Sequence, residues 1–336
     1  MPIFVIRRTL ALVLTLIAAS FVVFVLTQFS PANVAKETLG AYALPSQIKM
    51  LEQKLHLDDP LVVRYVRWAG VLLGLKKNPL DNPALGLGAK DPRGARYFGN
   101  FGYSTLFREP VNDIIWGRLA NTAILAGIAF AVIVPLSLVL GILAGMRPGS
   151  LLDRVLSITS ITMTSMPEYA LGVILAALFA VWLKVLPGTS PLTRGTGWPL
   201  SSQLVMPVAV LALIDSGYVA RMVRSSMIDI LDKPFIRTAI LKGLPRRRVI
   251  LRHALRNAMI TPFTVILLQI NWLIGGVVVT ETVFAYPGFG RMLLQASLFG
   301  DIALIEAATL IALVIAIATQ LLSDVGYWLL DPQARG

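Results

Sequence analysis

Long runs of apolar residues recur along the chain, and each is long enough to cross a lipid bilayer as a helix. A membrane-spanning helix needs about 20 consecutive, mostly apolar residues. Six stretches are predicted as spans: 9–29, 119–146, 155–183, 201–220, 257–280 and 302–329. They contain few charges, namely Glu168, Asp215, Glu306 and Asp324. The pattern predicts an all-α integral membrane protein with six transmembrane helices.

Lysine and arginine near the span ends predict the orientation, because cytoplasmic loops carry an excess of these residues. Residues 221–256 hold ten Lys/Arg and only two acids. Six spans place further arginines on the same side as this loop: Arg7, Arg8, Arg147, Arg154 and Arg335. Both termini are therefore predicted to be cytoplasmic, with an extracytoplasmic segment between helices 1 and 2 and a cytoplasmic helix-turn-helix between helices 4 and 5.

These predictions divide the chain into four parts. Residues 1–30 form the cytoplasmic N-terminus and first helix, and residues 31–117 form the extracytoplasmic segment. Residues 118–331 form a core of five further helices, and residues 332–336 a cytoplasmic tail. The first span also resembles a secretory signal, and Arg7-Arg8 a twin-arginine signal. Its apolar run exceeds the 7–15 residues of a signal peptide, so a retained anchor is expected.

The outer segment is large enough for a small extramembrane domain. Helical spacing of apolar residues predicts one helix over 46–57, with Ser46 as its cap. A second amphipathic helix is predicted over 61–75, ending near Gly74. Residues 78–102 are rich in Gly, Pro and Asn and are predicted to form a loop.

Composition excludes most other classes of protein. Apolar residues make up 56% of the chain and charged residues 14%, whereas soluble domains carry about 25% charged residues. The mean hydropathy is +0.74. The chain has no cysteine, which excludes thiolate nucleophiles, disulfides and Cys-based zinc sites. Its two histidines, His56 and His253, are predicted on opposite sides of the bilayer, so no metal site and no catalytic cluster is expected.

The basic loop between spans four and five contains the most informative pattern. Apolar residues fall on one side of a short helix: Phe235, Ile236, Ala239 and Ile240. Gly243 suits the left-handed position just past a helix end, and Pro245 suits the first turn of the next helix. Val249, Ile250 and His253 then share a face. We call residues 235–256 the knuckle. It is too short and too basic to span a bilayer, and its links to two spans suit it to transmit motion.

The loop resembles the coupling motif of ABC importer permeases of the dipeptide/oligopeptide/nickel class. The residues that carry the resemblance are Arg221-Met-Val-Arg-Ser-Ser-Met, Phe235-Ile-Arg-Thr-Ala, Lys242-Gly-Leu and His253-Ala-Leu-Arg-Asn-Ala. A second block, Thr280-Glu-Thr-Val-Phe-Ala-Tyr-Pro-Gly-Phe-Gly-Arg, is similar to another motif of the class, as is Arg118-Leu-Ala-Asn-Thr. The chain departs from the general importer motif where Arg237-Thr238-Ala239 replace Glu-Ala-Ala.

The resemblance implies a permease subunit that forms part of a translocation pathway for peptides or related small solutes. Its implied partners are a second permease, expected to be a paralogue, two ABC ATPase subunits and an extracytoplasmic solute-binding protein. The chain lacks a phosphate-binding Gly-Lys motif. We therefore expect no cofactor in this chain and no enzymatic activity of its own, with ATP and Mg held by the ATPases. The implied location is the lipid bilayer of a bacterial cytoplasmic (inner) membrane.

The candidate site residues fall into three groups. ATPase coupling is assigned to Phe235, Arg237, Thr238, Ala239, Gly243 and Leu244. The substrate pathway is assigned to Glu168, Asp215 and Glu306, because an acid inside a membrane is costly and marks a polar route. An outer gate or docking element is implied at Glu281, Phe284, Pro287, Gly288 and Gly290, while Phe284, Tyr286 and Phe289 are also candidates for anchors at the membrane interface.

Simpler interpretations exist for each group. The loop arginines also satisfy the positive-inside rule and suit anionic lipid head groups. The intramembrane acids could lie at span ends, and the Pro-Gly block could be an ordinary turn. At the level of function the main alternative is a stand-alone secondary transporter or channel, followed by a membrane enzyme or a non-transporting receptor. Nucleic acid is not an expected partner, because no aromatic residues alternate with the basic ones in the loop.

Overall fold

The computed structural model describes residues 2–28, 35–36, 39, 43–77, 93–94, 96–193 and 197–330. Regular structure within these ranges is helical, apart from one antiparallel bridge between Tyr103 and Pro110. The chain divides into two compact units, which are described separately. Unit 1 comprises Met1–Ala120 and Met292–Ile317, and unit 2 comprises Asn121–Arg291 and Ala318–Gly336. The prediction of an all-α protein is confirmed for the described residues.

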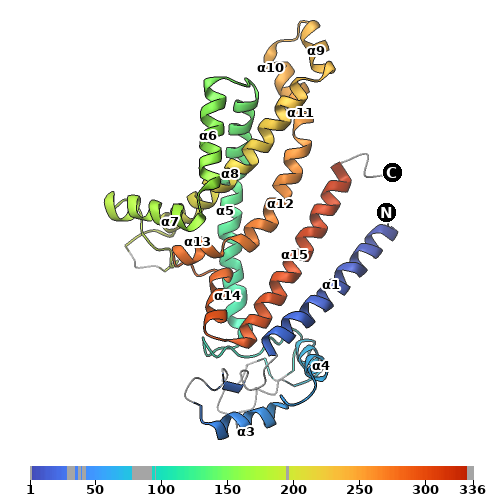
Figure 1. The fold of residues 1–336 in the computed structure, drawn as a ribbon, viewed down its shortest axis with the longest axis vertical. Coiled ribbons are helices and arrows are strands. Elements are labelled where there is room, and N and C mark those ends of the chain that lie inside the picture. Colours follow the sequence, from blue (N-terminus) through green and yellow to red (C-terminus); the bar gives the residue numbers. More distant parts are fainter. Residues whose placement is uncertain are drawn as a thin grey trace. The chain divides into compact units, whose positions relative to one another are not determined.

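The helices follow one another along the chain as Figure 1 labels them. Their bounds are α1 (Pro2–Gln28), α3 (Pro45–Leu55), α4 (Leu61–Leu72), α5 (Val111–Gly145), α6 (Leu151–Ser165), α7 (Glu168–Ala176), α8 (Leu200–Leu231), α9 (Pro234–Leu241), α10 (Arg246–Arg248), α11 (Leu255–Ala258), α12 (Ile260–Gly276), α13 (Val278–Val283), α14 (Phe289–Leu298) and α15 (Ile302–Leu330). Two segments are π-helical. Ala177–Trp182 extends α7, and Val249–Ala254 connects α10 to α11.

Four described helices are long and apolar enough to cross a membrane. These segments are Leu10–Gln28, Val111–Gly145, Leu200–Leu231 and Ile302–Leu321. The pair formed by Leu151–Ser165 and Glu168–Trp182 meets the same criteria together, which gives up to five candidates. Helix α12, in the region of the predicted fifth span, has 17 residues and a length of about 25 Å. Multiple spans are thus present, while the count of six stays a prediction.

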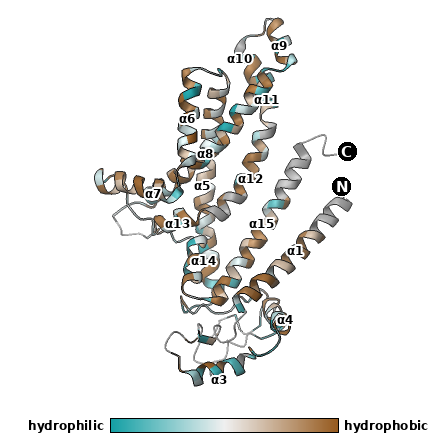
Figure 2. Cartoon of the chain, viewed as in Figure 1, coloured by the Kyte–Doolittle hydropathy of each residue, from teal (hydrophilic) through white to brown (hydrophobic). Residues whose placement is uncertain are grey.

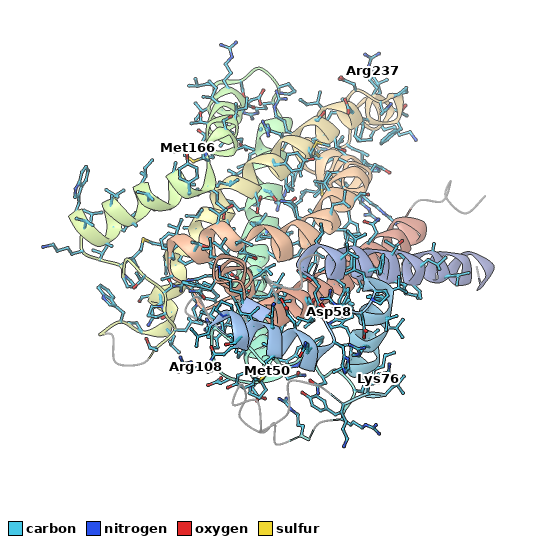
Figure 3. All side chains as sticks on the ribbon, turned by 60° about the horizontal axis from the view of Figure 1, so that its bottom comes forward. Met50, Asp58, Lys76, Arg108, Met166 and Arg237 are labelled. Carbon is cyan, nitrogen blue, oxygen red and sulfur yellow. The ribbon has the colours of Figure 1, made fainter. Side chains whose placement is uncertain are left out.

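The region predicted as one span over 155–183 is bent. Helix α6 ends at Ser165, and the following helix departs at 100°. Pro167 explains the break, because a proline disfavours helical geometry at the preceding residue. Met166 accordingly has φ −76° and ψ 132°, and Figure 3 shows it at the bend. The dipeptide Met166-Pro167 was the sequence signal for this bend, whereas Pro135 and Pro207 lie inside continuous helices.

The segment of unit 1 between α1 and α5 contains the two predicted helices. Helix α3 begins at Pro45 instead of after Ser46, so the predicted cap is wrong. The Gln47 side chain accepts a hydrogen bond from the Leu44 backbone N–H at 3.0 Å, and a proline at the first position needs no N–H partner. Helix α4 ends at Leu72, and Gly74 follows with a φ of +72°, as its position predicted. Most of the predicted loop 78–102 and the tail 332–336 lie outside the described residues.

Helices α5, α6 and α8 of unit 2 pack closely because glycines remove side chains from their contacts. A Cβ on Gly217 of α8 would lie 2.7 Å from the Ser160 carbonyl oxygen of α6. A Cβ on Gly141 of α5 would lie 2.6 Å from the Ala220 carbonyl oxygen of α8. Figure 2 shows apolar residues on α9 and polar residues at the end of α8 that leads to it.

Candidate functional site

The knuckle has the helix-turn-helix structure that its sequence predicted. Helix α9 ends at Leu241, and Gly243 follows with φ +73°, in the left-handed region that glycine adopts without steric cost. The Gly243 N–H donates to the Ile240 carbonyl at 2.9 Å and closes the helix end. The Pro245 carbonyl then accepts from Arg248 at 2.8 Å and Val249 at 3.1 Å, which begins the second helix. The prediction of positive φ at Gly243 is confirmed.

One face of α9 is buried inside the knuckle and another is exposed. Ile236 and Ala239 pack in an apolar cluster with Val249, Ile250 and Ala254. The prediction that Phe235 and Ile240 share this face is wrong. Phe235 is 43% exposed, Ile240 58% and Leu241 86%. The helix turns 100° per residue, so the cluster takes positions 236 and 239 and leaves these three outside.

The candidate coupling residues therefore differ in their exposure to solvent. Phe235, Arg237, Thr238 and Gly243 are exposed, and Figure 3 shows Arg237 extending from the end of the knuckle. Ala239 is buried, so it packs the knuckle and is not an open position for a partner helix. Leu244 is partly buried. Leu241 is the most exposed apolar residue of α9 and was not among the predicted coupling residues, although its spacing from Ile236 places it away from the buried face.

The block 280–291 forms a structured turn around one buried carboxylate. Glu281 is fully buried, and its carboxylate accepts hydrogen bonds from the Thr122 hydroxyl and from the Arg291 backbone N–H at 2.8 Å. The second bond places the negative charge in the first turn of α14, where the helix dipole favours an anion. The Glu281 backbone carbonyl also accepts from Tyr286 at 2.8 Å. Glu281 thus fixes both ends of the turn.

Residues at the start of the second predicted span complete this site. The Asn121 side-chain amide donates to the Pro287 carbonyl at 2.9 Å, and the Tyr286 hydroxyl donates to the Asn121 carbonyl at 2.7 Å. Thr122 in turn accepts from the Phe289 N–H at 2.7 Å. Two motifs more than 150 residues apart, which the sequence offered separately, therefore form one hydrogen-bonded site in unit 2. The 118–122 motif had no assigned role, and only the contact reveals one.

The aromatic residues and the glycines of this block both serve internal packing. The side chains of Phe284, Tyr286 and Phe289 are buried within the protein, so they do not anchor the chain at a membrane interface. Gly288 and Gly290 serve close packing, because a Cβ on Gly288 would overlap the Glu281 carboxylate and one on Gly290 would lie 2.5 Å from Val278. Their backbone conformation does not require positive φ.

Two of the candidate pathway acids lie in unit 2. Glu168 is partly buried in the first turn of α7, just after the bend, and accepts hydrogen bonds from the Thr280 N–H at 3.0 Å and from its hydroxyl. Asp215 is buried in α8 and interacts with the side-chain amide of Gln269. The carboxyl groups of Glu168 and Asp215 are also close enough for their charges to interact. Both acids therefore have polar partners on neighbouring helices.

Glu306 lies in unit 1 and joins α15 to α1 and α4. Its buried carboxylate accepts hydrogen bonds from Thr27 at 2.9 Å and from the Gln28 amide at 2.8 Å, and it also interacts with the Trp68 side chain. These neighbours are all donors, which suits an acceptor group. Glu306 also borders a cavity of about 10 Å³, which has room for about one water molecule.

Arg64 of α4 extends the same network. Its guanidinium donates to the Gln28 side-chain oxygen at 2.7 Å and to the Gln28 backbone carbonyl at 3.2 Å. Burial lowers the pKa of Arg64 from its ordinary value, and the charge of Glu306 partly offsets this effect. Gln28 thus bridges a buried cation and a buried acid, which reduces the cost of removing both from water.

Other proteins are similar to this chain in sequence or in fold. The model of the family "Binding-protein-dependent transport system inner membrane component" matches residues 137–336, and the model of its N-terminal region matches residues 1–126. A putative peptide transport system permease protein of Brucella abortus is 31% identical, with 98% of each chain covered. An oligopeptide transport system permease protein of Bacillus subtilis is 29% identical, with 99% of each chain covered.

A solved structure is similar in fold. A crystal structure of an amino acid ABC transporter aligns with a TM-score of 0.50 and 14% identity, covering 64% of this chain and 94% of that one. The apolar helices and the family matches define a multi-pass integral protein of the inner membrane. The chain belongs to the binding-protein-dependent transport system inner membrane component family and is a permease subunit of an ABC importer. ATP hydrolysis in such an importer takes place on partner subunits.

Proposed function

We propose that this chain imports short peptides or related small solutes together with a second, paralogous permease, two ATPase subunits and an extracytoplasmic binding protein. In this proposal the chain has six spans, residues 31–117 lie outside, and residues 221–256 and both termini lie in the cytoplasm. ATP-driven closure of the ATPases moves the knuckle, and the permease pair alternates between inward-open and outward-open states.

The exposed apolar residues of α9 carry the proposal. Phe235, Ile240 and Leu241 expose large side chains on a segment that none of the candidate spans includes. Apolar side chains grouped on an extramembrane surface mark an interaction site. Arg237 and Thr238 lie beside them and supply polar contacts around this apolar centre, as in many protein interfaces. The occupant that fits a permease subunit is the ATPase.

The names of several relatives support a peptide as the solute. Those from Brucella abortus and Bacillus subtilis are named for peptide and oligopeptide transport, and both align over nearly their whole length. Opines, modified sugars and nickel chelates are neighbouring solute classes. The acids Glu168, Asp215 and Glu306 remain our candidates for the pathway, where each would attract a positively charged group of a solute.

Co-purification tests the assembly. The tagged chain is expressed with the products of neighbouring genes, solubilised in mild detergent and recovered by its tag. We expect an ATPase and a second permease to be recovered with it. Replacing Leu241 by Ser should reduce ATPase recovery without reducing recovery of the second permease, because Leu241 is exposed on α9 and packs in no core. Arg247→Ala, also exposed on the knuckle, is the matched control.

Two results would contradict the proposal. Recovery of the tagged chain without any ATPase would remove the basis for an ATP-driven importer in this assembly. Solute uptake by vesicles that contain this chain and no ATPase would instead support a secondary transporter or channel.

A further inference from the structure

One stretch of α8, residues 223–227, contacts several elements of unit 2, and we call it the α8 junction. On one side it is held to the knuckle. Val223 and Met227 lie in the apolar cluster that contains Ile236 and Val249. The Ser226 hydroxyl donates to the Ala258 carbonyl at 2.7 Å, which ties the junction to α11. A displacement of the knuckle therefore acts directly on this part of α8.

On its other side the α8 junction is held to α6 by an ion pair. Arg224 donates from Nε to one oxygen of Asp153 at 2.5 Å and from Nη2 to the other at 2.8 Å. This two-point geometry fixes orientation as well as distance, because a planar guanidinium matches a planar carboxylate. Asp153 is buried in the first turn of α6, whereas the Arg224 side chain is 32% exposed.

Asp153 also organises the segment to which Arg224 is tied. Its carboxylate accepts from the Gly149 N–H at 2.8 Å and from the Ser157 hydroxyl at 3.2 Å. The Ser150 hydroxyl caps the same helix by accepting from the Asp153 N–H at 3.2 Å. The turn before α6, the first turn of α6 and α8 thus meet at one carboxylate, whose two oxygens receive four hydrogen bonds.

Close packing continues on both sides of this ion pair. A Cβ on Gly145 of α5 would lie 2.7 Å from the Met227 Cβ, so the α5 backbone packs directly on the α8 junction. Further along α6, Gly217 and Ser160 bring the α8 and α6 backbones together. Helices α6 and α8 therefore have few ways to slide past each other while the Arg224–Asp153 geometry holds.

We propose that Arg224 and Asp153 are positioning residues that make α6 follow the knuckle when the ATPases move it. This inference rests on the proposed function, in which ATPases engage the knuckle. Asp153 is buried, so its pairing with Arg224 offsets part of the cost of removing this carboxylate from water. The ion pair also has a geometric effect: it converts a movement of α8 into the same movement of the α5–α6 turn and of α6, which leads to the bend at Met166 and to Glu168.

The absence of cysteine allows a direct measurement of this coupling. Spin labels are attached at Leu151→Cys, at the start of α6, and at Arg247→Cys on the knuckle, both exposed positions. The distance between the two labels is measured by pulsed electron paramagnetic resonance spectroscopy in the complex purified with its ATPases. One sample contains no nucleotide, and the other contains ATP plus vanadate. We expect the same distance distribution in both states, because the two sites move as one body.

Substitutions at the ion pair separate positioning from folding. In Arg224→Met the nucleotide-free distance should be retained, while the ATP state should show a shifted and broadened distribution. Arg224→Lys keeps the charge without the two-point geometry and should give an intermediate shift. Arg154→Met, which removes an exposed cation next to Asp153 in the sequence, is the matched control and should behave as the unaltered chain.

Two outcomes would overturn the inference. One is an ATP-dependent distance change in the chain with an intact ion pair. The other is an unchanged distance in both states of Arg224→Met and Arg224→Lys at normal ATPase association. Failure of the unaltered chain to purify with an ATPase would instead overturn the proposed function, so the two failures are distinguishable.

Discussion

The carboxylate of Glu281 occupies the space in which a side chain at position 288 would lie. Gly288 leaves that space free, and Glu281 uses it to accept hydrogen bonds from Thr122 and from the backbone of Arg291. The Pro-Gly block therefore depends on a buried acid for its shape, and the acid depends on the glycine for its position.

Replacing Gly288 by Ala should displace the Glu281 carboxylate and destabilise unit 2. Overpacking in a tightly packed site costs about 1–3 kcal/mol. Thermal unfolding of the purified protein in detergent measures the change. Gly127→Ala is the control, since a Cβ at Gly127 meets no atom within 4 Å. Equal midpoints for the two variants would show that Glu281 can move without cost.

Replacing Glu306 by Gln should weaken the contacts among α15, α1 and α4. The new amide presents an N–H₂ group to a site whose neighbours Thr27 and Gln28 already donate. Leaving a buried polar group unsatisfied costs about 1–3 kcal/mol. We expect a lower unfolding midpoint and altered uptake kinetics with ATPase association retained. The exposed Glu109→Gln is the control, and a Glu306→Gln protein as stable and as active as that control would exclude this role.

Replacing Glu168 by Gln should have a smaller effect on stability, because the amide oxygen can still accept from Thr280. If the charge of Glu168 acts on a solute in the pathway, uptake kinetics should change while the unfolding midpoint does not. Uptake measured at several solute concentrations shows whether the charge of Glu168 acts on the solute or only on the structure. Unchanged kinetics would reduce Glu168 to a structural contact between α7 and α13.

Replacing Gly243 by Val should strain the knuckle. A β-branched residue at φ +73° costs roughly 1–2 kcal/mol or more, although space for a Cβ is available. We expect normal membrane insertion, reduced ATPase recovery and lost uptake. Arg247→Ala on the same segment should be milder. Normal ATP-driven uptake by Gly243→Val at equal abundance in the membrane would contradict the coupling role of the knuckle.

Single cysteines can test the orientation, since the chain has none of its own. Leu75, Leu151 and Leu241 are 70%, 78% and 86% exposed. An impermeant maleimide applied to intact spheroplasts should label Leu75→Cys, whereas Leu151→Cys and Leu241→Cys should react only after permeabilisation. Labelling of all three from outside, or of none, would contradict the proposed arrangement of six spans.

Local patterns in the sequence predicted much of the fold. Apolar runs identified the helices that suit a membrane, since a lipid environment demands apolar side chains over a fixed length. Gly243 and Gly74 marked helix ends, because positive φ is a local property that glycine permits. The bend after Ser165 also has a local cause, Pro167, although the apolar run around it predicted a single span.

The partners of buried polar groups depended on tertiary structure. Nothing near Glu281 in the sequence indicates Thr122, and nothing near Arg224 indicates Asp153, because residues 159 and 71 positions apart meet only when helices pack. The same holds for α9, where spacing allowed several faces and the cluster around Val249 decided that Ile236 and Ala239 are buried. Sequence determines the local conformation of each segment through backbone sterics and side-chain polarity. Packing between distant segments decides which side chains satisfy one another, and it assembled the sites around Glu281 and Asp153.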